Sequence, residues 1–310
     1  MAVLIVTNEQ DLGADFVVLE LERRGVAVLR CNAERLPEWR VSLRPGEAWH
    51  LRDPRGRTVS ADATSGVWWR RPERPTFDHR LSAGEQQALV AQWQAFAEGL
   101  ASVSGPRWVS QPSAIAASED KAKQLTAARR AGFAVPATVW TNDVTQAHEI
   151  VSDASAVVKT VTAAHWEGDG EAAFVFARPV TQADLPPDGP DFATAPAAFQ
   201  ARISPKRDVR VTVAGRAVLA AETTAEELDW RLESGLEWQP HDLPANVARR
   251  CRTLVDALDL RFGGIDLALD QNGTYWFLEI NPNGEWAWLQ KRGLPIAPAI
   301  ADALTDARDC

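Results

Sequence analysis

The segment "TYWFLEINPNGEW" at 274–286 places a carboxylate and an amide in an otherwise apolar, strand-like run. Glu279 and Asn281 are two residues apart, so in a strand their side chains point to the same face. A buried carboxylate is costly unless it is paired or bound to a cation. Asp266 precedes an Asn-Gly pair at 272–273, which predicts a hairpin that brings all three residues to one face. Oxygen ligands of this kind suit Mg²⁺. An Asp at a strand end with a solvated Glu is the alternative.

The few lysines of the chain are the next candidates for chemistry. Lys159 lies in the apolar run "AVVKTV", where a buried ammonium needs a counter-charge such as a nucleotide phosphate. A strand-end lysine that reaches solvent is the alternative. Downstream, "HWEGDG" contains Gly168 and Gly170, and the backbone amides of a flexible loop can close over phosphates. Many hairpin loops also contain two glycines. Lys121 begins a helix after "SED", where a solvated charge would be ordinary.

The elements that must position these residues follow an α/β pattern. Residues 2–6 and 26–32 have the pattern of strands, and the segment 16–25 between them has helical spacing, which indicates a parallel βαβ unit. The turn after the first strand lacks G-x-G-x-x-G, which disfavours a dinucleotide-dependent oxidoreductase. The remaining expected elements are a hairpin at 47–62, helices at 82–101, 119–131 and 246–260, strands at 156–161, 198–203, 208–215, 217–222, 263–270 and 275–281, a loop at 162–174 and a surface connection at 181–197.

Composition excludes several classes of protein. The chain has 310 residues, 45% of them hydrophobic, which is enough for two or three sub-domains with cores. A net charge of -9 argues against binding to nucleic acid or to an anionic membrane surface. No apolar run approaches the length of a membrane span. The three cysteines are widely scattered, which favours a reducing, cytoplasmic setting.

The order of these segments resembles that of the ATP-grasp superfamily over nearly the whole chain. The segments that carry the resemblance are "EDKAKQL", "VVKT", "TAAHWEGDG", "FQARI", "RDVRV", "GGIDLALD" and "FLEINPNG". The opening "LIVTNEQDLGADFVVLELERRGVAVLRCN", together with "VWWRRP", "GFAVPATVWTND", "SPKRDVRVTVAG", "DWR" and "NPNGEWAW", is similar to the microviridin-type peptide ligases, the graspetide maturases. The resemblance implies an α/β fold with α+β sub-domains: an N-terminal pre-ATP-grasp domain at 1–110, a central sub-domain at 111–196 and a C-terminal sub-domain with the magnesium site at 197–310.

The resemblance also implies roles for individual residues. Many relatives have an acidic residue where this chain has Ala201, so a side-chain contact to adenine is not expected there. The implied roles are ATP binding by Lys121, Lys159, His165, Gly168, Gly170, Gln200, Ala201, Arg202, Ile203 and Asp208, catalysis by Arg210 and Lys159, and magnesium binding by Asp266, Glu279 and Asn281. A loop histidine without a role is the alternative for His165.

The implied reaction begins with attack of a substrate carboxylate on the γ-phosphate of ATP, which forms an acyl phosphate. In graspetide maturases the carboxylate is an Asp or Glu side chain of a ribosomal precursor peptide, and a Ser, Thr or Lys side chain of that peptide then closes a macrolactone or macrolactam ring. The implied partners are the leader and core of such a peptide and a second copy of the chain in a homodimer.

Contacts with the peptide are expected from side chains near the motif segments. The chain has thirteen Trp, and aromatic surfaces can bind a leader peptide. For most of these Trp residues the alternative is packing in the core. For "WWRR" the alternative is an ordinary strand end without a role in binding. The residues assigned to the peptide are Arg70, Arg71, Asp229, Arg231 and Trp286. Two other functions stay open: an ATP-grasp ligase that joins an amino acid to a small acid or a protein tail, and a non-catalytic module that binds nucleotide or peptide.

Overall fold

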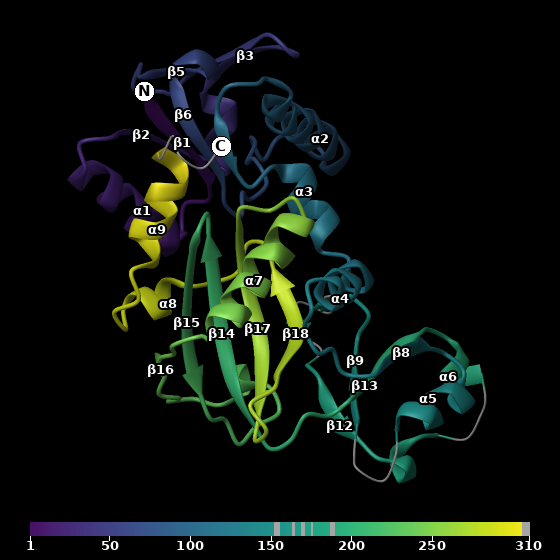
Figure 1. Ribbon diagram of the computed structural model, residues 1–310. Coiled ribbons are helices and arrows are strands. Elements are labelled where there is room, and N and C mark those ends of the chain that lie inside the picture. The colour runs from purple at the N-terminus through teal and green to yellow at the C-terminus, as the bar shows by residue number, and fades with distance from the viewer. Residues whose placement is uncertain (152–155, 163–164, 169–170, 175, 187–189, 306–310) are drawn as a thin grey trace.

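The computed structural model describes residues 1–151, 156–162, 165–168, 171–174, 176–186 and 190–305 (Figure 1). Helices and sheets alternate along the chain, and the expected mixed α/β architecture is confirmed. An antiparallel sheet from the C-terminal third stands in the middle of the molecule, with the N-terminal part at one end of it and the small central part beside the other end (Figure 1).

The N-terminal part is built on a parallel sheet in the order β2-β1-β6-β7. Its strands are β1 (Ala2–Thr7), β2 (Ala27–Asn32), β6 (Thr64–Trp69) and β7 (Arg107–Val109). Helix α1 (Leu12–Arg23) starts four residues before the expected position because Asp11 caps it, accepting a hydrogen bond from the backbone N–H of Ala14.

A second, antiparallel sheet covers this part of the molecule in the order β3-β4-β5. It consists of β3 (Arg40–Arg44), β4 (Ala48–Arg52) and β5 (Thr58–Ser60). The long helix α2 (Ala83–Gly99) follows, and Ser82 and Glu85 form a capping box at its start.

The central part contains the sheet β12-β9-β13-β8 and a separate hairpin. Helices α3 (Pro112–Ser118) and α4 (Lys121–Arg130) lead into it. Its elements are β8 (Thr138–Thr141), α5 (Val144–Ile150), β9 (Ala156–Lys159), β10 (His165–Gly168), β11 (Glu171–Phe174), β12 (Arg178–Val180), α6 (Pro190–Ala193) and β13 (Ala197–Ala201).

The segment expected to be a loop at 162–174 is largely regular structure instead. β10 and β11 pair antiparallel, with His165 opposite Phe174 and Gly168 opposite Glu171. The backbone hydrogen bonds of this pairing engage some of the amides that were expected to close over phosphates.

The C-terminal part is the antiparallel sheet β16-β15-β14-β17-β18, with α7 (Ala245–Ala257) packed against it. Its strands are β14 (Lys206–Ala214), β15 (Ala217–Thr223), β16 (Gln239–Pro240), β17 (Phe262–Asp270) and β18 (Tyr275–Asn281). The expected hairpin between β17 and β18 is confirmed, and Gly273 at its turn has a φ of 81°.

The chain ends with α8 (Ala287–Gln290) and α9 (Ile296–Thr305), which return to the N-terminal part. α9 packs against α1 and the strands β6 and β7, so one apolar core joins both ends of the chain. Short 3-10 helices lie at Ala33–Glu38, Ala61–Ala63, Leu100–Ser102, Gln182–Asp184 and Trp230–Leu232, and the last is named η5. In the part of the chain that is described, no helix has both the length and the apolarity to cross a membrane.

Candidate active site

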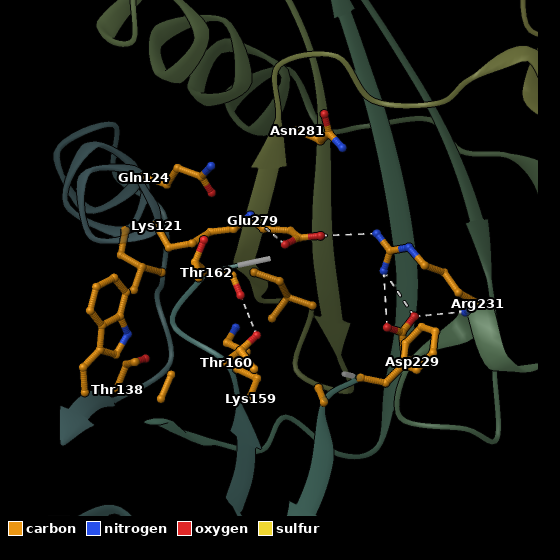
Figure 2. Close-up of a pocket in the computed structure, with 16 residues that line it drawn as sticks. Lys121, Gln124, Thr138, Lys159, Thr160, Thr162, Asp229, Arg231, Glu279 and Asn281 are labelled. Atoms are coloured by element: carbon orange, nitrogen blue, oxygen red, sulfur yellow. Dashed lines mark hydrogen bonds and ion pairs between the residues drawn. The ribbon is translucent and has the colours of Figure 1, made fainter. Parts of the chain in front are cut away.

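The candidate site lies where the central sheet faces the C-terminal sheet. A cavity of about 350 Å³ is lined by Lys121 of α4, Lys159 of β9 and Glu279 of β18, among others. A neighbouring cavity of about 150 Å³ shares Lys159 and Glu279 and adds Asp266 of β17. Figure 2 shows the larger cavity, with Glu279 between Lys121 and Arg231 and with Lys159 below it. The fold thus brings the candidate phosphate and metal residues to one cleft.

The paired carboxylates predicted from the hairpin lie directly opposite each other. Asp266 of β17 is the register partner of Glu279 of β18, and an irregularity in the ladder follows between Asp266 and Leu267. Asn281 is two residues further along β18, opposite Gly264, and its Oδ1 accepts a hydrogen bond of 2.9 Å from the backbone N–H of Asn283. Asn281 also lines the larger cavity. The predicted magnesium residues therefore share one stretch of the sheet.

Positive charges surround the Glu279 carboxylate. Lys121 Nζ lies 3.0 Å from its Oε2, and Arg231 Nη2 lies 3.2 Å from its Oε1. Burial alone would raise the pKa of Glu279, but Lys121 and Arg231 outweigh burial and lower that pKa to about 2. Burial likewise opposes the charge of Arg231, and Asp266 and Glu279 overcome this and raise the pKa of its guanidinium. The site is therefore a cluster of ionised groups.

Lys159 lies half-buried at the end of β9. Its Nζ donates a 3.1 Å hydrogen bond to Gln200 Oε1 of β13, and Gln200 Nε2 in turn donates a 2.8 Å bond to Thr138 Oγ1 of β8. Burial lowers the pKa of Lys159, against the opposing effect of Glu279. The ammonium thus faces the cleft on a polar relay that fixes its position.

The hinge predicted to meet adenine begins with the last two residues of β13 and continues past the end of that strand. Gln200, Ala201, Arg202 and Ile203 all line the smaller cavity. The backbone N–H of Ala201 donates a 2.8 Å bond to the carbonyl of Ala137, so that amide is already engaged.

Asp208, predicted to reach a ribose, is buried at the edge of the same cavity. It forms an ion pair with Lys206 on the same strand. Burial raises the pKa of Asp208, and Lys206 acts in the opposite direction.

Arg210 of β14 is buried beneath the metal pair. Its Nη1 lies 2.9 Å from Asp266 Oδ1, and its Nη2 donates a 3.3 Å bond to the carbonyl of Glu285. Gly264 and Gly284 make room for it, because a Cβ at either position would lie within 2.4 Å of Arg210 Nη2. The guanidinium is therefore held rigidly, and any glycine-to-alanine change beside it would displace it.

Two residues assigned to the peptide are buried instead. Arg70 is 0% exposed: its Nε lies 3.2 Å from Asp11 Oδ2, and its Nη1 donates to the carbonyls of Asn283 and Gly284. Trp286 is also 0% exposed and lies against Phe16 of α1, with ring centroids 6.3 Å apart. The return of the C-terminal segment to the N-terminal sheet encloses both side chains, and their burial disfavours direct contact of either one with a peptide.

The other residues assigned to the peptide border the cleft. Asp229 and Arg231 line both cavities already described. Arg71 and Arg231 line a third cavity of about 430 Å³, whose lining includes Asn281 but neither Lys121 nor Lys159, and Arg71 forms an ion pair with Glu285 there. These three residues keep their assignment as a proposal.

Aromatic packing accounts for part of the tryptophan content. Trp230, Trp238 and Trp288 form a cluster with centroid distances of 4.9 to 5.5 Å, and the guanidinium of Arg231 lies 4.8 Å from the Trp230 ring centroid. Packing among these rings fixes the segment that carries Arg231.

The phosphate-loop prediction is only partly within the described structure. The backbone of His165 and Gly168 lies in β10. Gly170 lies outside the described residues.

The side chains of the site can supply part of the coordination shell of Mg²⁺, and water and phosphate oxygens would complete it. Among the described residues no group of three or more His, Cys, Asp and Glu side chains could hold a metal ion. Asp266, Glu279 and Asn281 supply two carboxylates and one amide, and Mg²⁺ usually completes its shell with water and phosphate oxygens. A guanidinium nitrogen already lies between the two carboxylates, so their arrangement accepts a cation.

Sequence reasoning missed several side chains of the site. Gln124 donates from Nε2 to the carbonyls of Ser118 and Ile280, at 2.7 and 2.8 Å, and so ties α4 to β18. Its spacing of three residues from Lys121 places both on one helix face, which is the signal that was available. Thr138 and Trp140 line the cavity from β8, and no sequence signal marked them.

Comparisons with known proteins agree with this geometry. No family profile and no curated protein matches the chain. Among solved structures, the macrocyclase MdnC of Microcystis aeruginosa MRC, bound with precursor peptide MdnA, is 27% identical with a TM-score of 0.85, covering 99% of this chain and 100% of that chain. A RiPP-associated ATP-grasp ligase of Chryseobacterium gregarium, in complex with ADP and a leader and core peptide, is 27% identical with a TM-score of 0.85, covering 99% and 97%.

A third similar structure is the macrocyclase MdnB of Microcystis aeruginosa MRC, 25% identical with a TM-score of 0.77 and covering 99% of each chain. All three cover nearly the full length of this chain. The fold is therefore that of the ATP-grasp ligases, and the comparisons support the identification of the chain as a graspetide-type maturase among them.

Proposed function

We propose that the protein uses ATP to activate Asp or Glu side chains of a ribosomal precursor peptide and closes side-chain macrolactone or macrolactam rings. The observation that carries the proposal is the facing pair Asp266 and Glu279, with Lys121 and Lys159 in the same cleft as Glu279 and with Arg210 bonded to Asp266. The similar macrocyclases and RiPP-associated ligase support the choice of a peptide substrate.

The reaction has two balanced steps. The peptide carboxylate attacks the γ-phosphorus of ATP, ADP leaves, and an acyl phosphate forms. A hydroxyl or amine of the same peptide then attacks the acyl carbon, phosphate leaves, and the nucleophile gives up a proton. Phosphoryl transfer depends mainly on positioning and on neutralisation of charge.

The side chains of the cleft supply that positioning. Lys121 and Lys159 would bind phosphate oxygens, and the hinge at 200–203 would present backbone groups to adenine. Arg210, fixed against Asp266, would face the transferred phosphate. Asp266, Glu279 and Asn281 would hold Mg²⁺, which offsets the charge of the phosphates.

The peptide would approach from the side opposite the nucleotide. The cavity of about 430 Å³ lacks the two candidate phosphate-binding lysines, and its lining includes Arg71, Arg210 and Arg231. Guanidinium groups suit the carboxylates of an acidic core peptide. Tethering both reacting groups on one bound peptide raises their effective concentration, which favours ring closure.

Two further properties belong to the same proposal. A homodimer in the cytoplasm follows from the family resemblance and from the scattered cysteines. Cys31 and Cys251, the two cysteines within the described residues, are buried and free of disulfides. Light scattering behind size exclusion would test the dimer.

Mass spectrometry of a co-expressed precursor peptide tests the function. Each closed ring should lower the peptide mass by one water, and mild base should then hydrolyse esters but not amides. A gain of one amino-acid residue would instead establish the ligase that joins an amino acid to an acid. A peptide that binds tightly and stays unmodified, with the nucleotide present, would establish the non-catalytic module.

A further inference from the structure

One guanidinium holds the two candidate metal carboxylates together. Arg231, on the short turn η5, places its Nη2 3.2 Å from Asp266 Oδ2 and 3.2 Å from Glu279 Oε1. The same side chain is 41% exposed and reaches the pair from solvent. Two adjacent carboxylates repel each other unless a cation lies near both, so this nitrogen does locally what a metal ion would do.

The other oxygens of the pair are taken by different cations. Asp266 Oδ1 lies 2.9 Å from Arg210 Nη1, and Glu279 Oε2 lies 3.0 Å from Lys121 Nζ. The two oxygens that face each other across the hairpin are therefore the two that Arg231 contacts. A metal ion that uses both carboxylates must take the oxygens that Arg231 holds.

A metal ion and the Arg231 guanidinium cannot both lie between the facing oxygens of Asp266 and Glu279. Mg²⁺ binds oxygen at about 2.0–2.1 Å and requires near-octahedral geometry, so an ion on both oxygens lies where Nη2 lies. Arg210 cannot make way, because its side chain is only 5% exposed and is wedged beside Gly264 and Gly284. Arg231, at 41% exposed against 29% for Lys121, is the most exposed cation of the cluster and can move.

Arg231 has contacts that can hold its side chain after Nη2 leaves the two carboxylates. Nη1 lies 3.2 Å from Asp229 Oδ1, and the guanidinium lies over the Trp230 ring. Neither contact involves the metal pair. Arg231 also lines all three cavities of the site, including the one whose lining lacks Lys159.

We propose that Arg231 is an exchangeable internal cation: it holds Asp266 and Glu279 together before metal binds, and the incoming divalent ion displaces its Nη2 while Asp229 retains its Nη1. This inference rests on the metal site of the proposed function. It adds that Arg231 weakens metal binding in the empty enzyme and preserves the spacing of the carboxylates. Arg231 is a positioning residue in this respect.

Metal binding by the full-length, nucleotide-free protein tests the proposal without any turnover. Mn²⁺ replaces Mg²⁺ as the probe, and its free fraction is followed by electron paramagnetic resonance. If Arg231 holds the pair in about nine-tenths of the metal-free molecules, Arg231→Met strengthens the apparent affinity for Mn²⁺ about tenfold. Arg231→Gln, which keeps a polar side chain without the charge, should do the same.

Two control variants separate the possible outcomes. Arg207→Met removes an arginine of the same sheet, 49% exposed and paired with Glu222 at 2.6 Å, and should leave Mn²⁺ affinity unchanged. Glu279→Gln should abolish or strongly weaken Mn²⁺ binding. If wild type and both Arg231 variants bind no Mn²⁺, the metal site of the proposed function fails.

If Glu279→Gln loses the ion while the Arg231 variants bind it as wild type does, the metal site stands and the exchange is refuted. Weaker binding in the Arg231 variants also refutes it, because Arg231 would then support the ion. Thermal melts supply a second readout. Mn²⁺ should raise the Tm of Arg231→Met by more than it raises the Tm of wild type, because the metal then restores a missing cation.

Discussion

Replacement of Arg70 by methionine should cost a large share of the stability of the protein. Arg70 is 0% exposed and lies at the junction of the N-terminal sheet and the loop at 283–285. Its Nε is 3.2 Å from Asp11, whose side chain is 3% exposed. Methionine keeps the hydrocarbon stem and removes the guanidinium, so the change isolates the polar contacts.

The expected cost follows from the partners that Arg70 leaves behind. Removing one member of a buried ion pair costs about 3–5 kcal/mol, because the other charge stays buried without compensation. Thr7 Oγ1 still donates a 2.8 Å bond to Asp11, which offsets part of this. The carbonyls of Asn283 and Gly284 also lose a hydrogen-bond donor, and each lost bond lowers the free energy of unfolding by roughly 1 kcal/mol. We therefore expect the free energy of unfolding to fall by about 3 kcal/mol or more.

Urea denaturation followed by tryptophan fluorescence measures this loss, since Trp68 lies 5.8 Å from the Arg70 guanidinium. Arg71→Met is the matched control. Glu285 Oε1 lies 3.1 Å from Arg70 Nη2 and also pairs with Arg71. Because Arg71 is 48% exposed, its loss should cost less than about 1 kcal/mol.

A double variant tests the origin of the effect. Asp11→Asn keeps a side chain that can cap α1 and removes the charge, so adding it to Arg70→Met should recover part of the loss. Equal costs for the Arg70 and Arg71 variants, or no recovery from Asp11→Asn, would refute the reasoning.

The remaining predictions concern the cleft. Glu279→Gln should fold but lose peptide-dependent ATP turnover, measured as phosphate release, because the metal pair loses an anionic ligand; release at the wild-type rate would exclude Glu279 as a ligand. Lys159→Met should weaken ATP binding about tenfold or more by calorimetry, since a charge-assisted bond contributes roughly 1.5–3 kcal/mol; unchanged affinity would leave Lys159 with a purely structural role. The pKa of Glu279 lies at about 2 in the folded protein against 4.5 for the free side chain, so its contribution to stability is present above pH 4.5 and is lost as pH falls toward 2. Acid titrations of wild type and Glu279→Gln should therefore diverge in that window, and parallel curves would show that the carboxylate is not stabilised by its cations.

The local pattern of the sequence was sufficient to predict that the two carboxylates lie close together. Strand periodicity places Glu279 and Asn281 on one face, and the Asn-Gly turn brings Asp266 near the segment from Phe277 to Glu279. The irregularity in the ladder between Asp266 and Leu267, which no sequence signal predicted, then sets Asp266 directly opposite Glu279. These are short-range rules, because a two-residue period and a tight turn act within a single hairpin. The expected order of helices and strands follows from the same kind of signal.

Only the tertiary structure shows that Arg70 and Trp286 are buried. Each stands beside a motif segment and has the residue type of a binding side chain, but α8 and α9 return to the N-terminal sheet and bury both. That packing joins segments more than two hundred positions apart, and no local pattern encodes which surface such a helix covers.

The position of Arg231 likewise depends on the whole fold. The segment at 224–238 lies between β15 and β16 and has little regular structure, so neither helical nor strand periodicity predicts where its side chains point. Packing of Trp230 against Trp238 and Trp288 fixes the turn and places the guanidinium between two carboxylates from other strands. The sequence by itself determined which residues could hold a cation. The three-dimensional packing determined that the guanidinium of Arg231 lies between Asp266 and Glu279, because its position depends on contacts between strands and loops that are remote in the chain.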